Sequence, residues 1–497
     1  MSKPKTSDNA LIYGVDDIPP PMETAVLGLQ HYLTMFGSTV AIPLMMAAPL
    51  GISDDAEKLG WLIGTMFFVS GIATLLQTTI GNRLPIVQGG TFSFLAPAIA
   101  ICGMASLNTA GFEVKMQHIQ GAVIIGGVAQ MAVGYSGLIG KLLKYVGPVT
   151  IAPTIALIGL ALYPFGVPTV ALDWKIGGLT IFLVVLFSQV LRKKHRIFEL
   201  FPILLGMGGA WLTAIVLSEA GYYTAGDPSF TSWDRVADAA WFRLPLPFQW
   251  GMPVFSAAAI IGMMAGVAAS IVESVGDYYA CARLAGAPVP TPKVVSRGIG
   301  TEGLGGLIAG IFGSGNGTTS YSENIGAIGL TRVGSRRVVQ VGAVIMIVLG
   351  VTSKFGALFT AMPQPVVGGM YCTLFGMIVA VGLSNLQFVD MNASRNLFII
   401  GFAFFMGLSL PFYLGGYLAA HPDPFVNSHW ALKALGDVGI TLGSTGMAVG
   451  AVIAVVLDNI VPGTDEERGL TNWGNSPDAE TNSKDEGAEK TAASEEE

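Results

Sequence analysis

Two acidic side chains lie four residues apart in an otherwise apolar stretch of the sequence. Glu273 and Asp277 belong to FSAAAIIGMMAGVAASIVESVGDYYACARLAG, residues 255–286. Residues at i and i+4 share one helix face, and charged groups inside a membrane helix usually face a cavity or a transport pathway. The alternative is that both carboxylates reach the membrane surface and have no function. Because Glu273 stands ten residues before Arg283, near mid-depth of a spanning helix, we expect the pair to be functional.

A second candidate site lies in a polar run, GSGNGTTSYSENIGAIGLTR, at residues 313–332. The Gly, Ser, Thr and Asn residues predict an unwound stretch, and Glu323 and Asn324 then begin a short helix. The free N–H groups and positive dipole end of such a helix can bind a polar ligand. Irregular backbone inside a membrane is tolerated only where it lines a cavity. The alternative is a loop outside the membrane.

Two further segments could support this site. In LPIVQGGTFSFLAPAIAI, residues 84–101, Gly89, Gly90 and Thr91 open onto Phe92 and a short apolar run. Paired interrupted segments in the two halves of a chain indicate a transporter's binding site.

The first apolar segment carries Gln30 and His31. A lone buried histidine is more often structural than ligand-binding, so both interpretations of His31 stay open.

The composition indicates that lipid surrounds much of the protein. Hydrophobic residues make up 52% of the chain, charged residues 12%, and the mean hydropathy is +0.61, whereas a soluble domain carries about 25% charged residues. No clustered metal ligands or nucleophile motif is present, and residues 313–317 lack the lysine of a phosphate-binding loop. We therefore expect no metal or other cofactor, and we set aside a membrane enzyme or receptor.

Apolar segments near 20 residues in length predict the membrane spans. Two of the fourteen candidates, 86–102 and 321–332, are too short to cross alone. Long outer connections are expected at 219–252 and 415–437. The candidate segments are 24–47, 59–80, 86–102, 118–136, 146–164, 175–191, 201–218, 254–284, 298–313, 321–332, 337–359, 364–384, 394–413 and 438–462.

Basic residues predict the orientation. With both termini cytoplasmic, fourteen Lys and Arg residues fall in inner loops and seven in outer loops, which follows the positive-inside bias. The densest cluster, 192–196, is then cytoplasmic, and Lys141 and Lys144 are also assigned inside. The N-terminus has no apolar core near a basic start, so we expect no cleavable signal peptide. From Gly463 the chain holds eleven acids and three bases and is expected to be disordered.

Several motifs together resemble the nucleobase/ascorbate transporter family, which includes bacterial uracil and xanthine permeases and animal sodium–ascorbate transporters. The family signature, N-x-G-x-x-x-x-T after an acid, amide or Pro, is similar to Glu323-Asn324-Ile325-Gly326 followed by Thr331-Arg332. Gln30-His31 is similar to the QH pair of the first span. The stretches ESVGDYYACARLAGAP (273–288) and GSRRVVQ (334–340) resemble the ascorbate and fungal purine branches.

The resemblance, which covers about residues 20–462, implies an all-α polytopic protein with fourteen segments in two inverted repeats of seven. Segments 3 and 10 would each contain a short extended piece. A core domain would move like an elevator against a gate domain, in a homodimer of the plasma (inner) membrane. The implied parts are an N-terminal segment 1–20, core domain 21–145 and 253–362, gate domain 146–252 and 363–462, and an acidic tail 463–497.

The resemblance also implies residue roles. Glu273 would bind substrate and couple the ion, and Glu323 would be a second acid on the substrate. Backbone groups of Phe92 and Ser322 would contact it, with Tyr321 beside them. The implied coupling and supporting residues are Asp277, His31, Gln30, Asn324 and Thr331.

These expectations favour a nucleobase, uracil or an oxopurine such as xanthine or urate, moved by symport with H⁺ or Na⁺. Ring N–H groups can donate to two carboxylates, and backbone N–H groups can serve the carbonyls. Ascorbate transporters carry Pro where this chain has Glu323, and uracil permeases usually carry His where it has Asp277. Transport of ascorbate or another organic anion is the alternative. The expected partners are the small-molecule substrate, the lipid bilayer and a second copy of the chain, with no nucleic acid.

Overall fold

The computed structural model describes residues 11–104, 106–139, 145–421, 424–425 and 428–470. Within them the chain is mainly helical, with one two-stranded sheet. Seven of the described helices are long and apolar enough to cross a membrane. The prediction of a helical, multi-pass membrane protein is therefore confirmed at this level, whereas fourteen spans in inverted repeats stay a prediction.

The helices and strands are distributed over both halves of the chain. The first half contains α1 (Pro21–Leu50), α2 (Ala56–Thr79), β1 (Gln88–Gly90), η1 (Phe92–Phe94), α3 (Leu95–Cys102), α4 (Phe112–Tyr135), α6 (Pro148–Ala161), η2 (Tyr163–Phe165), α7 (Val167–Val170), α8 (Trp174–Val185), η3 (Leu186–Val190), α9 (Arg196–Leu200), α10 (Pro202–Glu219) and α11 (Asp234–Asp238). The second half contains α12 (Ala257–Leu284), α13 (Pro292–Phe312), β2 (Thr318–Ser320), α14 (Ser322–Thr331), α15 (Arg336–Val351), α16 (Ser353–Thr360), α17 (Gln364–Ser384), η4 (Asn385–Phe388), α18 (Ser394–Ala420), α19 (Trp430–Gly443) and α20 (Gly446–Ile460).

Some predicted boundaries are wrong. The segment 337–359 is interrupted at Thr352, which leaves helical geometry between α15 and α16. The segment 438–462 falls on two helices, α19 and α20, separated at Ser444 and Thr445. The outer connection predicted at 415–437 is shorter, because α18 continues to Ala420 and α19 begins at Trp430. An apolar stretch predicts only the part of a helix that lies in lipid, and the helix itself can continue beyond the lipid.

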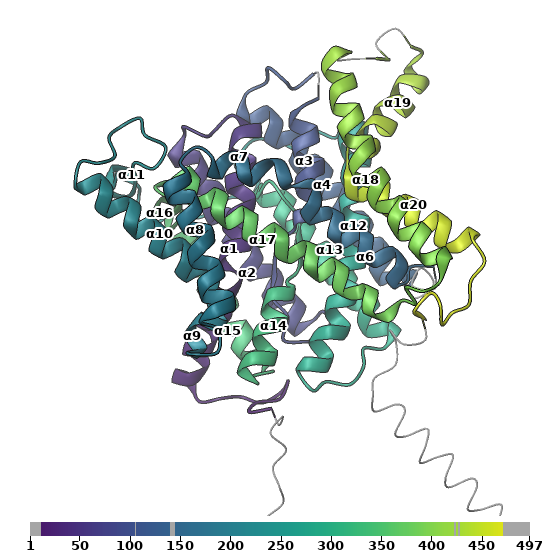
Figure 1. Cartoon of the computed structure of the whole chain (residues 1–497), viewed down its shortest axis with the longest axis horizontal. Helices are drawn as coiled ribbons and strands as arrows, with labels where there is room; N and C mark the ends of the chain where they lie inside the picture. The colour runs from purple at the N-terminus through teal and green to yellow at the C-terminus, as the bar shows by residue number, and fades with distance from the viewer. Residues whose placement is uncertain (1–10, 105, 140–144, 422–423, 426–427, 471–497) are drawn as a thin grey trace, which may run out of the picture.

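The helices pack in two groups. In one group α2 and α4 contact α13, α2 contacts α15 and α16, and α1 contacts α15. In the other, α6 contacts α17, α18 and α20, and α10 contacts α8 and α17. Figure 1 shows α8, α10 and α11 on the left and α18–α20 on the right, far apart in the view, with α17 running between them. The groups contain the segments assigned to the core and gate domains, although their relative movement stays a prediction.

Glycines let helices of the first group approach closely. A Cβ built on Gly64 of α2 would lie 2.8 Å from the carbonyl oxygen of Gly350 in α15. A Cβ on Gly28 of α1 would lie 2.9 Å from the amide nitrogen of Gly342 in the same helix α15. Real side chains do not fit at these distances, so α15 can pack on α1 and α2 only with small residues at the contacts.

The connection between α10 and α12 is fixed at both ends. Its first part is held by Asp173, which accepts hydrogen bonds from Tyr223 Oη and Ser229 Oγ, both at 2.6 Å. Its second part stacks the Arg243 guanidinium 3.6 Å from the ring centre of Trp61 in α2. This connection therefore joins α8 of one helix group to α2 of the other.

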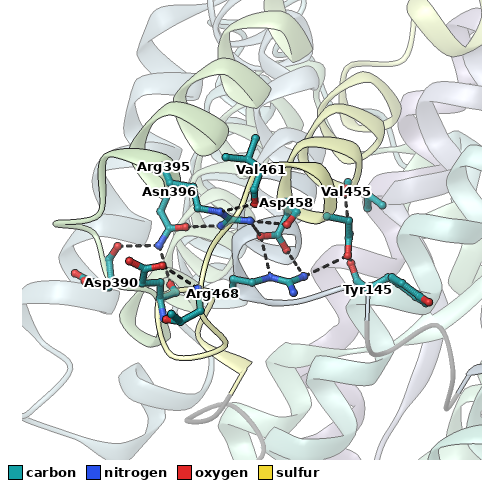
Figure 2. Close-up of polar contacts among 11 residues, drawn as sticks. Tyr145, Asp390, Arg395, Asn396, Val455, Asp458, Val461 and Arg468 are labelled. Carbon is teal, nitrogen blue, oxygen red and sulfur yellow. Dashed lines mark hydrogen bonds and ion pairs between the residues drawn. The ribbon is translucent and has the colours of Figure 1, made fainter.

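Residues 461–470, which follow α20, are folded onto the protein. Asp458 accepts from Arg395 of α18 at 2.8 Å and from Arg468 at 3.1 Å (Figure 2). Asn396 donates to the backbone carbonyls of Asp390 at 2.9 Å and Glu467 at 2.7 Å. The prediction of disorder from Gly463 is wrong for residues 463–470, because Asp458 and Asn396 bind this segment. The rest of the acidic tail, like residues 1–10, Lys141 and Lys144, lies outside the described residues.

Candidate functional site

A cavity of about 300 Å³ lies between the two helix groups. Residues of α1, β1, η1, α12, β2 and α14 form one side, and residues of α6, α10 and α17 form the other. All five predicted substrate-contacting residues line it: Phe92, Glu273, Tyr321, Ser322 and Glu323. The structure therefore brings these residues together from three separate parts of the chain, and their contact with a ligand stays a prediction.

The short strands place two helix starts at this cavity. β1 and β2 are antiparallel, with Gln88 opposite Ser320 and Gly90 opposite Thr318. Each strand then leads into a short helical piece, η1 with α3 or α14. The extended pieces expected in segments 3 and 10 are present, and they pair with each other.

Tyr321 fixes the exit from β2. Its amide donates to the Val87 carbonyl at 3.1 Å, and its hydroxyl donates to the Gly90 carbonyl at 2.8 Å. A Cβ on Gly89 would lie 2.6 Å from the tyrosine ring, so a larger residue at this position would displace it. The tyrosine therefore joins both strands at the point where α14 begins.

The first turn of α14 is held by two other helices. The Ser322 hydroxyl donates to Asp277 Oδ1 of α12 at 2.7 Å, and the Ser38 hydroxyl of α1 donates to Glu323 Oε1 at 2.5 Å. Asn324 Nδ2 donates to the His31 carbonyl of α1 at 2.7 Å. No side chain caps the α14 N-terminus, so its first-turn N–H groups remain available to a ligand.

Three carboxylates at or next to the cavity have no basic partner in the described part of the chain. Among the described residues, no ion pair involves Glu273, Asp277 or Glu323. Glu323 and Asp277 each accept from a serine, whereas Glu273 has no hydrogen-bond partner in the described part of the chain. Asp277 is 7% exposed, and its Oδ2 is buried without a partner among those residues. Burying an unpaired carboxylate costs several kcal/mol, so the site must be completed by a proton, a cation or a ligand's donor groups.

Sequence reasoning missed a buried acid next to the site. Glu302 of α13 is 1% exposed. It accepts from Ser274 Oγ at 2.6 Å and from Tyr278 Oη at 2.7 Å, and Gln77 Nε2 donates to the same tyrosine oxygen at 2.8 Å. Glu302 does not line the cavity; it supports α12 from behind. Its position inside the apolar segment 298–313 is a signal that could have identified it.

The predicted supporting residues differ in how close they lie to the site. His31 is buried and contacts Asn324 mainly through its backbone carbonyl. Gln30 and Thr331 do not line the cavity, and neither do Asp277, His31 and Asn324. Gln30 Nε2 is buried without a partner among the described residues. Thr331 lies at the far end of α14, where its hydroxyl accepts from the Val333 amide at 3.2 Å.

The cavity continues to the start of α10, where residues 199–204 line it. Glu199 there pairs with Arg192 at 3.1 Å, next to the basic cluster 192–196. The positive-inside bias predicts that this end is cytoplasmic, and the orientation stays a prediction.

The fold is similar to that of two solved structures. The transmembrane domain of a cyanobacterium bicarbonate transporter, BicA, aligns with a TM-score of 0.54 and 15% identity, over 86% of this chain and 99% of that one. The overall structure of SLC26A9 aligns with a TM-score of 0.55 and 12% identity, over 78% of this chain and 62% of that one. At these identities the comparison shows the fold alone.

Sequence comparison identifies the class of membrane protein. The family model described as Permease family matches residues 22–416. Solute carrier family 23 member 2 of Mus musculus is 44% identical over 95% of this chain and 77% of its own length. Nucleobase-ascorbate transporter 1 of Arabidopsis thaliana is 40% identical over 93% of this chain and 92% of its own length. The chain belongs to the nucleobase/ascorbate permease family.

Proposed function

We propose that this protein is a secondary active transporter that imports a nucleobase, uracil or an oxopurine such as xanthine or urate, by symport with H⁺ or Na⁺. One observation carries this proposal: Glu273 and Glu323 line the same cavity with no basic partner among the described residues. A ligand that donates ring N–H groups satisfies such a site, whereas an anion without such donors would face two carboxylates.

The remaining groups of the site complement a flat heterocycle. Ring N–H groups of the base would donate to Glu273 and to the second oxygen of Glu323, the one that Ser38 does not bind. Backbone N–H groups at the starts of η1 and α14 would donate to the ring carbonyls. Phe92, Ile155, Ile158 and Leu374 supply apolar contacts for the ring faces.

The coupling ion would act at Glu273 and Asp277. Asp277 Oδ2 and the Glu273 carboxylate lack partners among the described residues, and a proton or a sodium ion would compensate their charge. In this proposal the ion and the base bind together. Each compensates part of the free-energy cost of burying the acids, and this favours binding of the other.

The wider architecture is part of the same proposal. Fourteen segments form two inverted repeats, and a core domain (21–145 and 253–362) carries the site past a gate domain (146–252 and 363–462). Support comes from the cavity, which lies between two helix groups, and from the β1–β2 pair at corresponding positions of the two halves. The protein would be a homodimer in the plasma membrane with both termini cytoplasmic.

Transport of ascorbate or another organic anion is the second candidate. The names of the plant relatives include both nucleobase and ascorbate. Glu273 and Glu323 weigh against this candidate, because the described residues provide no lysine or arginine paired with either of them.

A ligand panel tests both candidates. Purified protein is screened by thermal shift with uracil, xanthine, urate, hypoxanthine and ascorbate, at two pH values, with and without sodium. Uptake into proteoliposomes is then measured for the ligands that bind. We expect stabilisation by at least one base and uptake driven by a proton or sodium gradient. Stabilisation and uptake with ascorbate alone would contradict the nucleobase proposal.

A further inference from the structure

One hydroxyl group of α1 has an unusual hydrogen-bond partner. Serine and threonine inside a helix commonly donate to their own backbone four residues earlier. Thr34 does so, to the Gln30 carbonyl at 2.9 Å, and Thr39 does so, to the Met35 carbonyl at 3.2 Å. Ser38 lies between them in the same helix, yet within the described residues its hydroxyl donates only to Glu323 Oε1, at 2.5 Å.

The position of Ser38 favours this contact over solvent. The side chain is 2% exposed and lines the cavity, next to the first turn of α14. His31, seven residues earlier on the same face of α1, holds Asn324 through its carbonyl at 2.7 Å. Two successive residues of α14 are therefore fixed by one face of α1.

We propose that Ser38 is a positioning residue that holds one oxygen of Glu323, so that this carboxylate turns its other oxygen toward the ligand. The inference rests on the proposed function, because it specifies which ligand groups the same cavity accepts. A carboxylate held in this way presents its free oxygen in a fixed direction. The N–H group that donates to this oxygen then sets the orientation of the ligand's ring plane.

Loss of the hydroxyl should change selectivity more than transport capacity. In Ser38→Ala, the Glu323 carboxylate can rotate, and either oxygen can face the ligand. A hydrogen bond to a charged group contributes about 1.5–3 kcal/mol, which corresponds to a factor of about ten or more in binding. We therefore expect the KM of the preferred base to rise about tenfold with kcat little changed. Discrimination against analogues methylated at the ring nitrogens should fall.

The transport experiment compares Ser38→Ala and Ser38→Thr with wild type, over a panel of uracil, xanthine and their N-methylated analogues. Thr180→Ala is the matched control, since Thr180 is another buried helical hydroxyl, is bonded to the Ile176 carbonyl of its own helix, and is not among the residues that line the cavity. Ser38→Thr keeps a hydroxyl and should restore the wild-type preference. A Ser38→Ala variant with wild-type KM and wild-type discrimination would overturn the inference.

A second measurement needs no ligand. Melting temperatures of wild type, Ser38→Ala, Glu323→Ala and the double variant form a thermodynamic cycle that isolates the Ser38–Glu323 interaction. We expect non-additive shifts, with Ser38→Ala having little further effect once Glu323 is removed. Additive shifts would overturn the inference. Failure of the wild type to take up any base would refute the proposed function instead, while this cycle still decides whether Ser38 holds Glu323.

Discussion

Buried acids in two regions of this protein differ in their partners. Asp458, at the end of α20, has a fully buried side chain and two arginines, Arg395 and Arg468, at 2.8 and 3.1 Å (Figure 2). The acids beside the cavity, Glu273, Asp277 and Glu323, have only hydroxyl donors or none among the described residues. A paired carboxylate stabilises the fold in one ionic state, whereas an unpaired one can gain and lose a proton, an ion or a ligand.

The largest effect is expected where the charge is paired. Asp458→Asn leaves two arginines without their common partner, and breaking a buried pair typically costs about 3–5 kcal/mol. We expect a large fall in melting temperature and poor recovery of folded protein in detergent. Asp465→Asn, at an exposed acid in the same C-terminal segment, is the control and should melt like wild type. An unchanged melting temperature for Asp458→Asn would show that the cluster is not structural.

The opposite pattern is expected at Glu273. Glu273→Gln removes the charge that has no partner, so the fold should keep its melting temperature. Uptake should fall by about 100-fold or more, because the ligand loses a charged acceptor and the ion loses its site. Radiolabelled uptake into proteoliposomes measures the loss, and Glu113→Gln, at an exposed acid paired with Lys58 at 3.0 Å, is the control. Full uptake by Glu273→Gln would remove its coupling role.

A smaller change is expected at Glu323. In Glu323→Gln the amide still occupies the site, but its NH₂ group donates where the carboxylate accepted. We expect the preference among uracil, xanthine and ascorbate to shift by about tenfold, which corresponds to about 1.4 kcal/mol. Competition assays with unlabelled ligands give these ratios. An unchanged order of preference would mean that this side chain does not contact the ligand.

The smallest effect is expected at Asp173, the residue before α8 that holds the connection between α10 and α12. Burial opposes ionisation of Asp173, but hydrogen bonds from Ser229 and Tyr223 and the Lys175 amide outweigh it and hold its pKa below the usual value. A carboxylate with a lowered pKa stabilises the fold above about pH 4, the ordinary pKa of Asp, and this contribution is lost as pH falls through the lower pKa.

Asp173→Asn should therefore reduce stability by about 1 kcal/mol at neutral pH. The difference from wild type should shrink as pH falls below about 4. Melting curves over this pH range provide the measurement. A difference between variant and wild type that grows on acidification would contradict the assignment.

Local sequence identified most of the acidic site. Glu273, Asp277 and Glu323 stand out because each interrupts a stretch that is otherwise apolar or glycine-rich, and such interruptions are costly unless they face a cavity. Glu302 stands in a similar context but received no role, although it is almost fully buried and accepts from Ser274 and Tyr278. The same criterion, applied to every apolar segment, would have found it.

The amino-acid sequence by itself determined that lipid surrounds the protein, where the chain is interrupted, and which acids lie in apolar surroundings. These properties depend on composition and on neighbours along the chain. Only the tertiary structure decided that β1 pairs with β2, that Ser38 holds Glu323, and that Arg395 and Arg468 bind Asp458. Contacts between β1 and β2, or between Ser38 and Glu323, join residues more than 200 positions apart. Their partners are selected by the packing of whole helices, which no local pattern records.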